Sequence, residues 1–358
     1  MNPSPRPHGG TDAAGPAQYD FSTNSNACGP CPQVLAAVQS ADASRYPDSG
    51  YTALRAALAK FHGVAPWRVV LAGSASEFIF RITAWAAQQG AQRVSLPAHA
   101  YGDYAHAAKA WGLQIVSQPE AAELVWACEP SSPLGQAQLH WSGAWISARH
   151  AGTEADVDSY APEHADANAG KVSASVLDRA YAPLRLSGAS SLNDAQLDRV
   201  WQLFSPNKSL GLTGVRAAYA LAPCDAQTAV AQLDALAASW VLGAHGVALL
   251  NAWVQDASQT WLQASLHTLA VWKQRQLAML QTAGWTVQPS DTPFFVARPP
   301  EPTDAVALCA TLRHCGIQLR DATSFGLPGW VRLGVLPPVA QDVLAAALLQ
   351  TSIQDITT

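Results

Sequence analysis

The residue whose type and setting point most directly to chemistry is Lys208. It stands in the segment SPNKSLGLTGVR, residues 205–216, which is small, polar and glycine-bearing and lies between two apolar runs, 200–204 and 217–221. A lysine in a connection between buried elements is partly desolvated, which lowers its pKa and makes its amine a usable nucleophile. A Schiff base to an aldehyde cofactor is one such use. From this segment alone, an ordinary loop lysine is an equally good interpretation.

A second chemical feature is the Gly/Ser turn at residues 72–76, Ala-Gly-Ser-Ala-Ser. It follows a predicted strand at 67–71, and a helix with apolar residues at Phe78, Ile79 and Ile82 begins at once. The free N–H groups and the dipole of such a helix start attract phosphate groups. Many α/β turns share this pattern without binding anything, so the signal is weak by itself.

Composition excludes several classes of partner. The chain has 358 residues, 49% hydrophobic and 13% charged, with a net charge of −5, and its pI is near 6.0. These values argue against nucleic acid or an anionic membrane as the main partner. No apolar run reaches the length of a transmembrane helix, and residues 1–16 do not resemble a signal peptide. We therefore expect a cytoplasmic protein.

The six cysteines include one C-x-x-C pair, Cys28 and Cys31. This pair suggests redox chemistry or zinc binding. However, a second such pair is absent, no strand leads directly into this one, and the histidines show no metal-ligand spacing. The sequence therefore predicts reduced thiols and no metal site.

The order of elements indicates the fold class. Apolar strands are expected at 67–71, 93–96, 113–117, 124–128, 145–148 and 172–177, alternating with helices; Asp178 ends the last strand. This alternation predicts an α/β fold with a mostly parallel sheet and ligands at the carboxyl ends of its strands. After residue 221 the pattern becomes a long helical stretch (225–254), a second helix (261–283) and then an α+β region. Residues 1–18 are expected to form a loose arm.

Taken in order, these features resemble a known family. The turn at 73–76, the aromatic Tyr101, Asp178 with Tyr181, and Lys208 with Arg216 look like the pyridoxal-phosphate enzymes of aspartate-aminotransferase fold type I. The resemblance runs from about Tyr19 to Leu348. It implies a large cofactor-binding domain at 35–245 and a smaller domain made of 1–34 and 246–358.

The resemblance assigns the cofactor's contacts residue by residue. Lys208 would carry pyridoxal 5′-phosphate as a Schiff base, and Arg216 would bind its phosphate. In Asp178-Arg-Ala-Tyr181, which resembles the family's Asp-Glu-Ala-Tyr, the aspartate would hold the pyridine nitrogen protonated and the tyrosine would bond the ring hydroxyl. Further cofactor contacts are expected from Ala75, Ser76, Tyr101 (stacked on the ring), Ser132 and Ser205.

The resemblance also implies a partner and a substrate site. Tyr46, in Arg-Tyr-Pro-Asp, matches a tyrosine that reaches the cofactor phosphate of the other subunit, which implies a homodimer. Arg332 would grip the substrate's carboxylate, with Arg320 as a second substrate arginine. Two further residues, Asn24 and Asn26, would lie on the substrate side.

The sequence departs from the family pattern at three places. Where the family has Asn-Pro-Asn-Asn-Pro-Thr-Gly, residues 129–135 read Glu-Pro-Ser-Ser-Pro-Leu-Gly, so Ser132 replaces an asparagine. Arg179 replaces a glutamate, and Asn207 replaces a small hydroxyl residue. These departures leave an inactive scaffold as one alternative.

The phrases Phe-Ser-x-Asn-x-Asn, Tyr-Gly-Asp-Tyr and Ser-Phe-Gly-Leu-Pro-Gly-Trp-Val-Arg are most similar to the threonine-phosphate decarboxylases of cobalamin biosynthesis. The resemblance therefore predicts decarboxylation of L-threonine O-3-phosphate to (R)-1-aminopropan-2-yl phosphate. An aminotransferase of histidinol-phosphate type, also acting on a small phosphorylated substrate, is the first alternative.

Overall fold

The computed structural model describes residues 8–138 and 174–356. Its centre is a seven-stranded sheet in which one strand is antiparallel to its neighbours and the rest are parallel. The mostly parallel sheet expected from the sequence is confirmed, although the strand expected at 145–148 lies outside the described residues. The strand order is β2 (Val69–Ala72), β8 (Ala218–Leu221, the antiparallel strand), β7 (Trp201–Phe204), β6 (Ala174–Asp178), β5 (Leu124–Cys128), β3 (Arg93–Ser95) and β4 (Gln114–Val116).

Helices cover both faces of this sheet, because successive strand residues point to opposite sides. On β2, Val69 and Leu71 join one hydrophobic core, whereas Val70 and Ala72 join another. The first core is closed by α1 (Pro32–Gln39), α2 (Thr52–His62), α8 (Ala244–Trp253) and part of α9 (Asp256–Thr282). The second is closed by α3 (Ala75–Gln88), α4 (Gly102–Ala110) and α7 (Gln227–Ala235).

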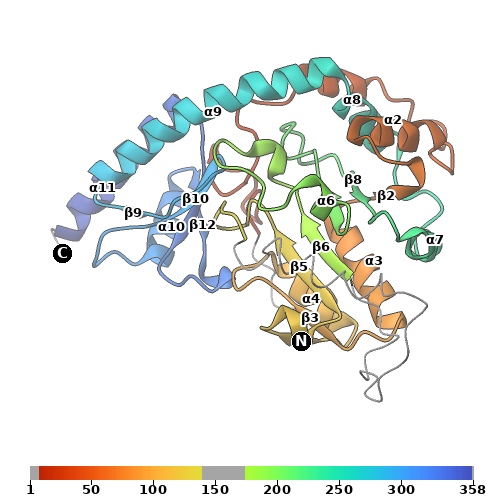
Figure 1. Ribbon diagram of the computed structural model, residues 1–358. Helices are drawn as coiled ribbons and strands as arrows, with labels where there is room; N and C mark the ends of the chain where they lie inside the picture. The colour runs from red at the N-terminus through yellow and green to blue at the C-terminus, as the bar shows by residue number, and fades with distance from the viewer. Residues whose placement is uncertain (1–7, 139–173, 357–358) are drawn as a thin grey trace.

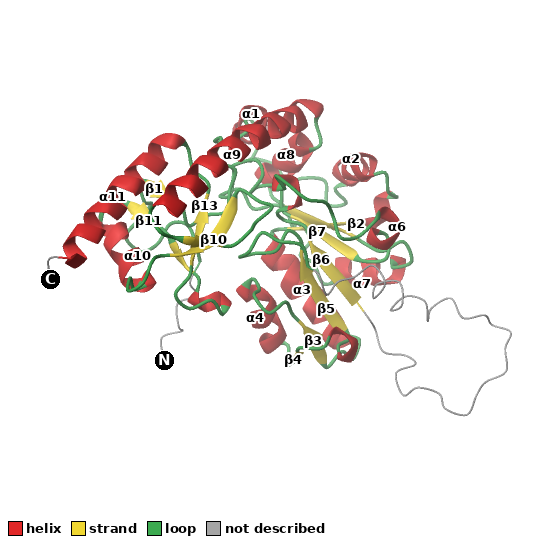
Figure 2. Ribbon diagram, turned by 60° about the vertical axis from the view of Figure 1, so that its left-hand side comes forward, coloured by secondary structure: helices red, strands yellow, loops and turns green. Residues whose placement is uncertain are grey.

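A smaller α+β unit forms the other half of the molecule (Figures 1 and 2). Its antiparallel sheet has the order β12 (Arg320–Asp321), β13 (Val331–Gly334), β10 (Phe294–Arg298) and β9 (Thr286–Val287). Its core also takes residues from α10 (Ala305–His314) and α11 (Pro338–Ile356). The 27-residue helix α9 runs between the two halves and packs against both.

Short elements complete the chain. They are β1 (Tyr19–Asp20), which pairs with β11 (Ile317–Gln318), α6 (Asp194–Leu197), and the 3-10 turns η1 (Pro66–Arg68), η2 (Pro119–Ala121), η3 (Ala182–Leu184) and η4 (Thr323–Phe325). Over residues 8–138 and 174–356, no helix combines the length and apolarity that crossing a bilayer requires.

The long helix expected at 225–254 is wrong, because the chain breaks between α7 and α8. The hydroxyl of Tyr51 donates to the carbonyl of Leu242 at 2.8 Å and accepts from the N–H of Leu242 at 3.0 Å. These bonds hold residues 236–243 out of the helix, so a tertiary contact overrides high helix propensity.

The loose arm expected at the N-terminus is also wrong for residues 8–18, which are docked. Gly10 N donates to Ser22 Oγ at 2.8 Å, and Gln318 Nε2 donates to Gly10 O at 2.7 Å. Asp12 forms an ion pair with Arg313. A glycine is required at position 9, since a Cβ there would lie 2.1 Å from the carbonyl oxygen of Ser22.

Candidate active site

The carboxyl ends of four strands meet at one edge of the large sheet. Strands β5, β6 and β7 are parallel, and β2 runs the same way because β8 lies antiparallel between it and β7. A cavity of about 760 Å³ opens at this edge. In open α/β sheets ligands bind at this end of the strands.

Lys208 lies in this cavity, in the connection that follows β7. Its Nζ donates to Ser205 Oγ at 3.0 Å and lies 5.8 Å from the centre of the Tyr181 ring. Burial lowers the pKa of Lys208, and the nearby Asp178 carboxylate partly opposes that shift. A buried lysine of lowered pKa supplies neutral amine, which is the reactive form.

Asp178 ends β6 and is buried in the same cavity. Its Oδ1 accepts from the N–H of Ala180 at 2.9 Å, and its Oδ2 accepts from the hydroxyl of Tyr104 at 2.6 Å. Burial raises the pKa of Asp178, whereas these two donors and the charge of Lys208 lower it. Each oxygen of the Asp178 carboxylate therefore accepts a hydrogen bond, and the two bonds fix the orientation of the group.

The loop that carries Lys208 is shaped by Asn207, a departure from the family pattern. Asn207 Nδ2 donates to the carbonyls of Thr213 and Val215, while its Oδ1 accepts from Ser205 Oγ at 2.8 Å. Asn207 thus ties the start of the loop to its end, so the substitution has a structural use here. A Cβ at Gly211, where φ is +69°, would lie 2.5 Å from a backbone oxygen.

The C-x-x-C segment packs behind this loop. Cys31 N donates to the carbonyl of Leu210 at 2.9 Å, and the oxygen that Gly211 approaches belongs to Gly29. Burial raises the pKa of the Cys28 thiol to about 11, which makes it a poor nucleophile at neutral pH. Within residues 8–138 and 174–356, no cluster of three or more His, Cys, Asp or Glu side chains is arranged to hold a metal.

The start of α3 forms another wall. Ser74 is its N-cap, and the Ser74 hydroxyl accepts from Glu77 N at 3.0 Å. Ala75 and Ser76 follow in the first turn and line the cavity; the Ser76 hydroxyl lies 3.1 Å from that of Tyr101. This wall offers N–H groups, a helix dipole and a hydroxyl to an anion.

Two neighbouring arginines form the wall on the smaller unit. Arg320 and Arg332 are paired across β12 and β13, and the Cζ atoms of both lie over the ring of Phe325, at 4.8 and 5.5 Å. Arg320 Nη2 donates to Ser324 Oγ at 2.6 Å, and Arg332 Nη2 donates to the carbonyl of Ser22 at 2.5 Å.

The guanidinium of Arg332 has an unsatisfied hydrogen-bond donor. Its Nε is buried without a hydrogen-bond partner, and no carboxylate of the described residues forms an ion pair with it. Burial lowers the pKa of Arg332 to about 10, so it remains charged at neutral pH. A buried cation without an anionic partner is costly, which makes this wall a ready site for an anion.

Most of the predicted site residues meet at this cavity. Its lining includes Asn24, Ala75, Ser76, Tyr101, Ser132, Asp178, Tyr181, Ser205, Lys208, Arg216, Arg320 and Arg332.

Two predicted residues do not line the cavity. The expectation that Asn26 lies on the substrate side is corrected. Its Nδ2 donates to Ser209 O and to Ser265 Oγ, and its Oδ1 accepts from Cys28 N. The amide of Asn26 therefore fixes the loop that carries Lys208. Tyr46 is 79% exposed and stacks on Trp240, with ring centres 4.4 Å apart. A role for Tyr46 in another subunit stays a prediction.

The cavity residues that the sequence analysis did not assign to the site include His8, Tyr104 and Phe325. Tyr104 had a usable signal, because it lies three residues after Tyr101 and so on the same face of a helix. His8 and Phe325 had none, since both reach the cavity through contacts between segments distant in sequence.

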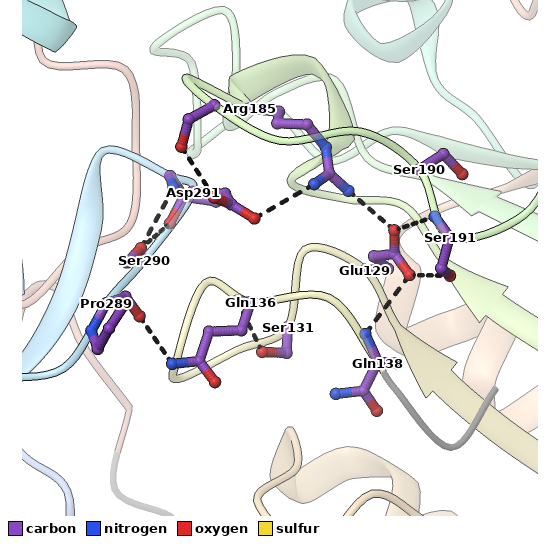
Figure 3. Close-up of polar contacts among 12 residues, drawn as sticks. Glu129, Ser131, Gln136, Gln138, Arg185, Ser190, Ser191, Pro289, Ser290 and Asp291 are labelled. Carbon is purple, nitrogen blue, oxygen red and sulfur yellow. Dashed lines mark hydrogen bonds and ion pairs between the residues drawn. The ribbon is translucent and has the colours of Figure 1, made fainter. Parts of the chain in front are cut away.

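The loop that carries Ser132 is held by a polar network shown in Figure 3. We call Glu129, Arg185 and Asp291 the charged clasp. Arg185 Nη2 lies 3.0 Å from Glu129 Oε1, and Arg185 Nη1 lies 3.5 Å from Asp291 Oδ2. Glu129 also accepts from the N–H and hydroxyl of Ser191.

Backbone bonds reinforce this clasp. Asp291 N donates to Gly135 O at 2.7 Å, and Leu186 N donates to Asp291 O at 2.6 Å. Lys273 on α9 donates to the carbonyl of Ser290. The segment before β10 is thereby fastened to two loops of the large sheet.

Comparison with known proteins identifies the family. The family model for aminotransferase class I and II matches residues 16–137 and 176–348. The chain belongs to this family. Class I and II aminotransferases are enzymes that use pyridoxal 5′-phosphate, so the predicted fold type, the enzymatic nature and the cofactor are confirmed.

Individual relatives narrow the comparison. The chain is 26% identical to the histidinol-phosphate aminotransferase of Roseobacter denitrificans, over 90% of this chain and 88% of the relative. The histidinol-phosphate aminotransferase of Sinorhizobium meliloti, solved with pyridoxal 5′-phosphate, has a TM-score of 0.74 and 22% identity, with 93% of this chain and 90% of that one covered. The L-threonine-O-3-phosphate decarboxylase of Porphyromonas gingivalis has a TM-score of 0.69 and 19% identity, covering 93% and 99%.

The cavity fits the family's cofactor. A buried amine, a buried carboxylate and a phenol lie together at Lys208, Asp178 and Tyr181, and these suit an aldehyde, a pyridine nitrogen and a ring hydroxyl. The start of α3 and the exposed guanidinium of Arg216 suit a phosphate. The flat ring of Tyr101 offers a stacking surface.

Proposed function

We propose that this enzyme is an aminotransferase that acts on a small amine carrying a phosphate group, in the manner of the histidinol-phosphate aminotransferases. The observation that carries the proposal is the unpaired, buried Arg332 beside Arg320, facing a cavity that holds Lys208. Two guanidiniums side by side match the double charge of a phosphate monoester. The names of the curated relatives support transamination over the decarboxylation favoured by the sequence phrases.

Each residue has a proposed role. Pyridoxal 5′-phosphate, when bound, supplies the electron sink that stabilises negative charge at the substrate's α-carbon. Lys208 holds the cofactor and then moves the proton at the α-carbon. Asp178 keeps the pyridine nitrogen protonated, and Tyr181 bonds the ring hydroxyl. Ser132, Ser205, Ser76, Ala75 and Arg216 complete the cofactor's contacts.

Arg320 and Arg332 would fix the substrate's anionic group. Their placement determines which substituent of the α-carbon faces Lys208 and hence which bond breaks. Asn24 lies beside the hydroxyl of Tyr181 and lowers the pKa of that group, which burial raises. We assign Asn24 to the substrate side of the cavity.

Decarboxylation of threonine phosphate is the second candidate. That substrate carries both a carboxylate and a phosphate, so each of the two arginines would have its own anion. The docked segment at His8 and Gly9 narrows the cavity beside Arg332, which suits a short substrate.

One experiment separates the candidates. The purified protein is mixed with pyridoxal 5′-phosphate, and its absorbance spectrum is compared with that of Lys208→Ala. Histidinol phosphate with 2-oxoglutarate is then added in one sample, and threonine phosphate in another. Glutamate in the first sample supports the proposal. Carbon dioxide in the second without glutamate in the first would replace it with the decarboxylase; cofactor binding without either product would favour an inactive scaffold.

A homodimer forms part of the proposal. The exposed Tyr46 and Trp240 make an aromatic pair on the surface, and Trp240 Nε1 donates to Pro47 O at 3.0 Å, so the pair is held in place. We propose that Tyr46 reaches the cofactor phosphate of a second subunit. Light scattering that reports a monomer would contradict this, as would unchanged cofactor affinity in Tyr46→Ala.

A further inference from the structure

Tyr104 is a buried tyrosine that contacts Asp178 directly. It belongs to α4, is 1% exposed, and donates its hydroxyl proton to Asp178 Oδ2 at 2.6 Å. Its ring stacks on Trp126 of β5, with ring centres 4.6 Å apart and planes inclined by 19°. The ring is therefore fixed by packing, and the hydroxyl can reach the carboxylate without rearrangement.

The groups around Asp178 come from four segments. Tyr104 approaches from α4, Cys128 from the neighbouring strand β5, Lys208 from the connection after β7, and Tyr181 from its own segment. Cys128 and Tyr181 are buried, and burial raises the pKa of both groups, so both remain neutral at physiological pH. Lys208 is the one cation in this set.

Under the proposed function Lys208 is bonded to the cofactor. Its charge is then no longer available to stabilise the Asp178 carboxylate as it does in the cofactor-free protein. The donors that remain are the N–H of Ala180 on Oδ1 and the hydroxyl of Tyr104 on Oδ2. Burial raises the pKa of Tyr104 well above 10, so its hydroxyl keeps the proton it donates. A carboxylate that accepts such bonds is favoured in its charged form.

We propose that Tyr104 is a positioning residue that keeps Asp178 ionised and aims it at the pyridine nitrogen of the cofactor. This inference rests on the proposed role of Asp178. Tyr104 fixes one oxygen and the Ala180 N–H fixes the other, so the carboxylate cannot rotate. A neutral or rotated carboxyl group would not hold a protonated pyridine nitrogen.

The test is the affinity of the cofactor-free protein for pyridoxal 5′-phosphate, measured by quenching of tryptophan fluorescence between pH 5.5 and 8.5. Tyr104→Phe keeps the ring and removes the hydroxyl. We expect it to weaken binding about tenfold at pH 7.5, since a hydrogen bond to a charged group is lost. The loss of affinity on acidification should also begin at higher pH than in the wild type. The cofactor itself titrates in this pH range and does so equally in both samples. The quantity of interest is therefore the ratio of the two affinities, wild type to Tyr104→Phe, at each pH.

A double-mutant cycle identifies the route of the effect. Asp178→Asn should weaken binding by itself, and Tyr104→Phe/Asp178→Asn should be no weaker than Asp178→Asn, because Tyr104 acts through Asp178. Additive losses in the double variant would overturn the inference. Normal binding by Tyr104→Phe beside weak binding by Asp178→Asn would overturn it while leaving the proposed function intact. Normal cofactor binding by Asp178→Asn would contradict both the inference about Tyr104 and the proposed role of Asp178.

Tyr219→Phe is the matched control. Tyr219 is also fully buried, and its hydroxyl accepts from Trp253 Nε1 at 3.1 Å and bonds His62 Nε2 at 2.8 Å, but it does not line the cavity. In Tyr219→Phe the free energy of unfolding should fall by about as much as in Tyr104→Phe, and cofactor affinity should not change. Equal weakening in both variants would show a general structural effect and would overturn the inference.

Discussion

Arginines lie in two regions at the junction of the two halves, and the groups that face their charges differ. In the clasp, Arg185 lies between the carboxylates of Glu129 and Asp291. In the cavity wall, Arg332 has a backbone carbonyl and an aromatic ring as neighbours but no ion-paired carboxylate in the described part of the chain. A paired buried charge holds a structure together, whereas an unpaired one makes binding of a counter-ion favourable. The contrast therefore distinguishes Arg185, which joins the two halves, from Arg332, which is suited to bind an anionic ligand.

The largest expected effect is at the amine that faces this wall. Lys208→Ala should abolish both the absorbance of covalently held cofactor and turnover, because Lys208 supplies the amine beside Asp178 and Tyr181. Absorbance spectroscopy and product analysis check this. The matched control is Lys60→Ala on the exposed surface of α2, which should behave as wild type. Retained turnover in Lys208→Ala would refute the assignment of this amine.

The next effect concerns the unpaired arginine. Arg332→Gln should lower kcat/KM roughly 100-fold, since two hydrogen bonds to a charged group are lost. Cofactor affinity should change little, because the loss falls on the substrate. Steady-state kinetics and fluorescence titration measure the two quantities. If Arg332→Gln stabilises the protein and leaves kcat/KM unchanged, the wall does not hold the substrate's anion.

The clasp should respond in the opposite way. Glu129→Ala removes a buried partner of Arg185, and breaking such a pair lowers the free energy of unfolding by about 3 kcal/mol. Denaturant unfolding measures this, with the exposed Glu301→Ala as control. The extra stability conferred by bound cofactor should persist. A normal unfolding free energy with lost cofactor affinity would place Glu129 in the binding site instead.

Lys273 gives the smallest effect and a pH signature. Burial lowers its pKa to about 8 in the folded protein, from an ordinary 10.5. Between these values the unfolded chain binds more protons, so stability from this group rises with pH from about 8 to 10.5. Relative to wild type, Lys273→Met should therefore be more stable by about 1–2 kcal/mol at pH 7 than at pH 10, after discounting for partial exposure. Parallel pH curves for the two proteins would contradict the shift.

Sequence reasoning predicted the parts of this molecule that local pattern determines. The apolar strands, the Gly/Ser start of α3, and the placing of Lys208 and Asp178 at strand ends all follow from short segments. The resemblance to the pyridoxal-phosphate enzymes implied that these residues share one site, and they line one cavity.

The rest depends on contacts between distant residues. The break before α8 comes from Tyr51, almost 200 positions earlier. The docking of residues 8–18 depends on Ser22, Gln318 and Arg313, and Asn26 is occupied by Ser265 on α9. None of these pairings leaves a periodic trace in the sequence, so no propensity or spacing could reveal them.

The docked segment beside Arg332 has a practical consequence for anyone who purifies this enzyme. A polyhistidine tag that replaced residues 1–7 would begin beside the cavity, which His8 lines, and would bring further imidazole groups there. The C-terminal end of α11 lies on the far side of the smaller unit (Figure 1). A tag placed there leaves the entrance clear, and kinetic constants from the two versions of the protein should not be pooled.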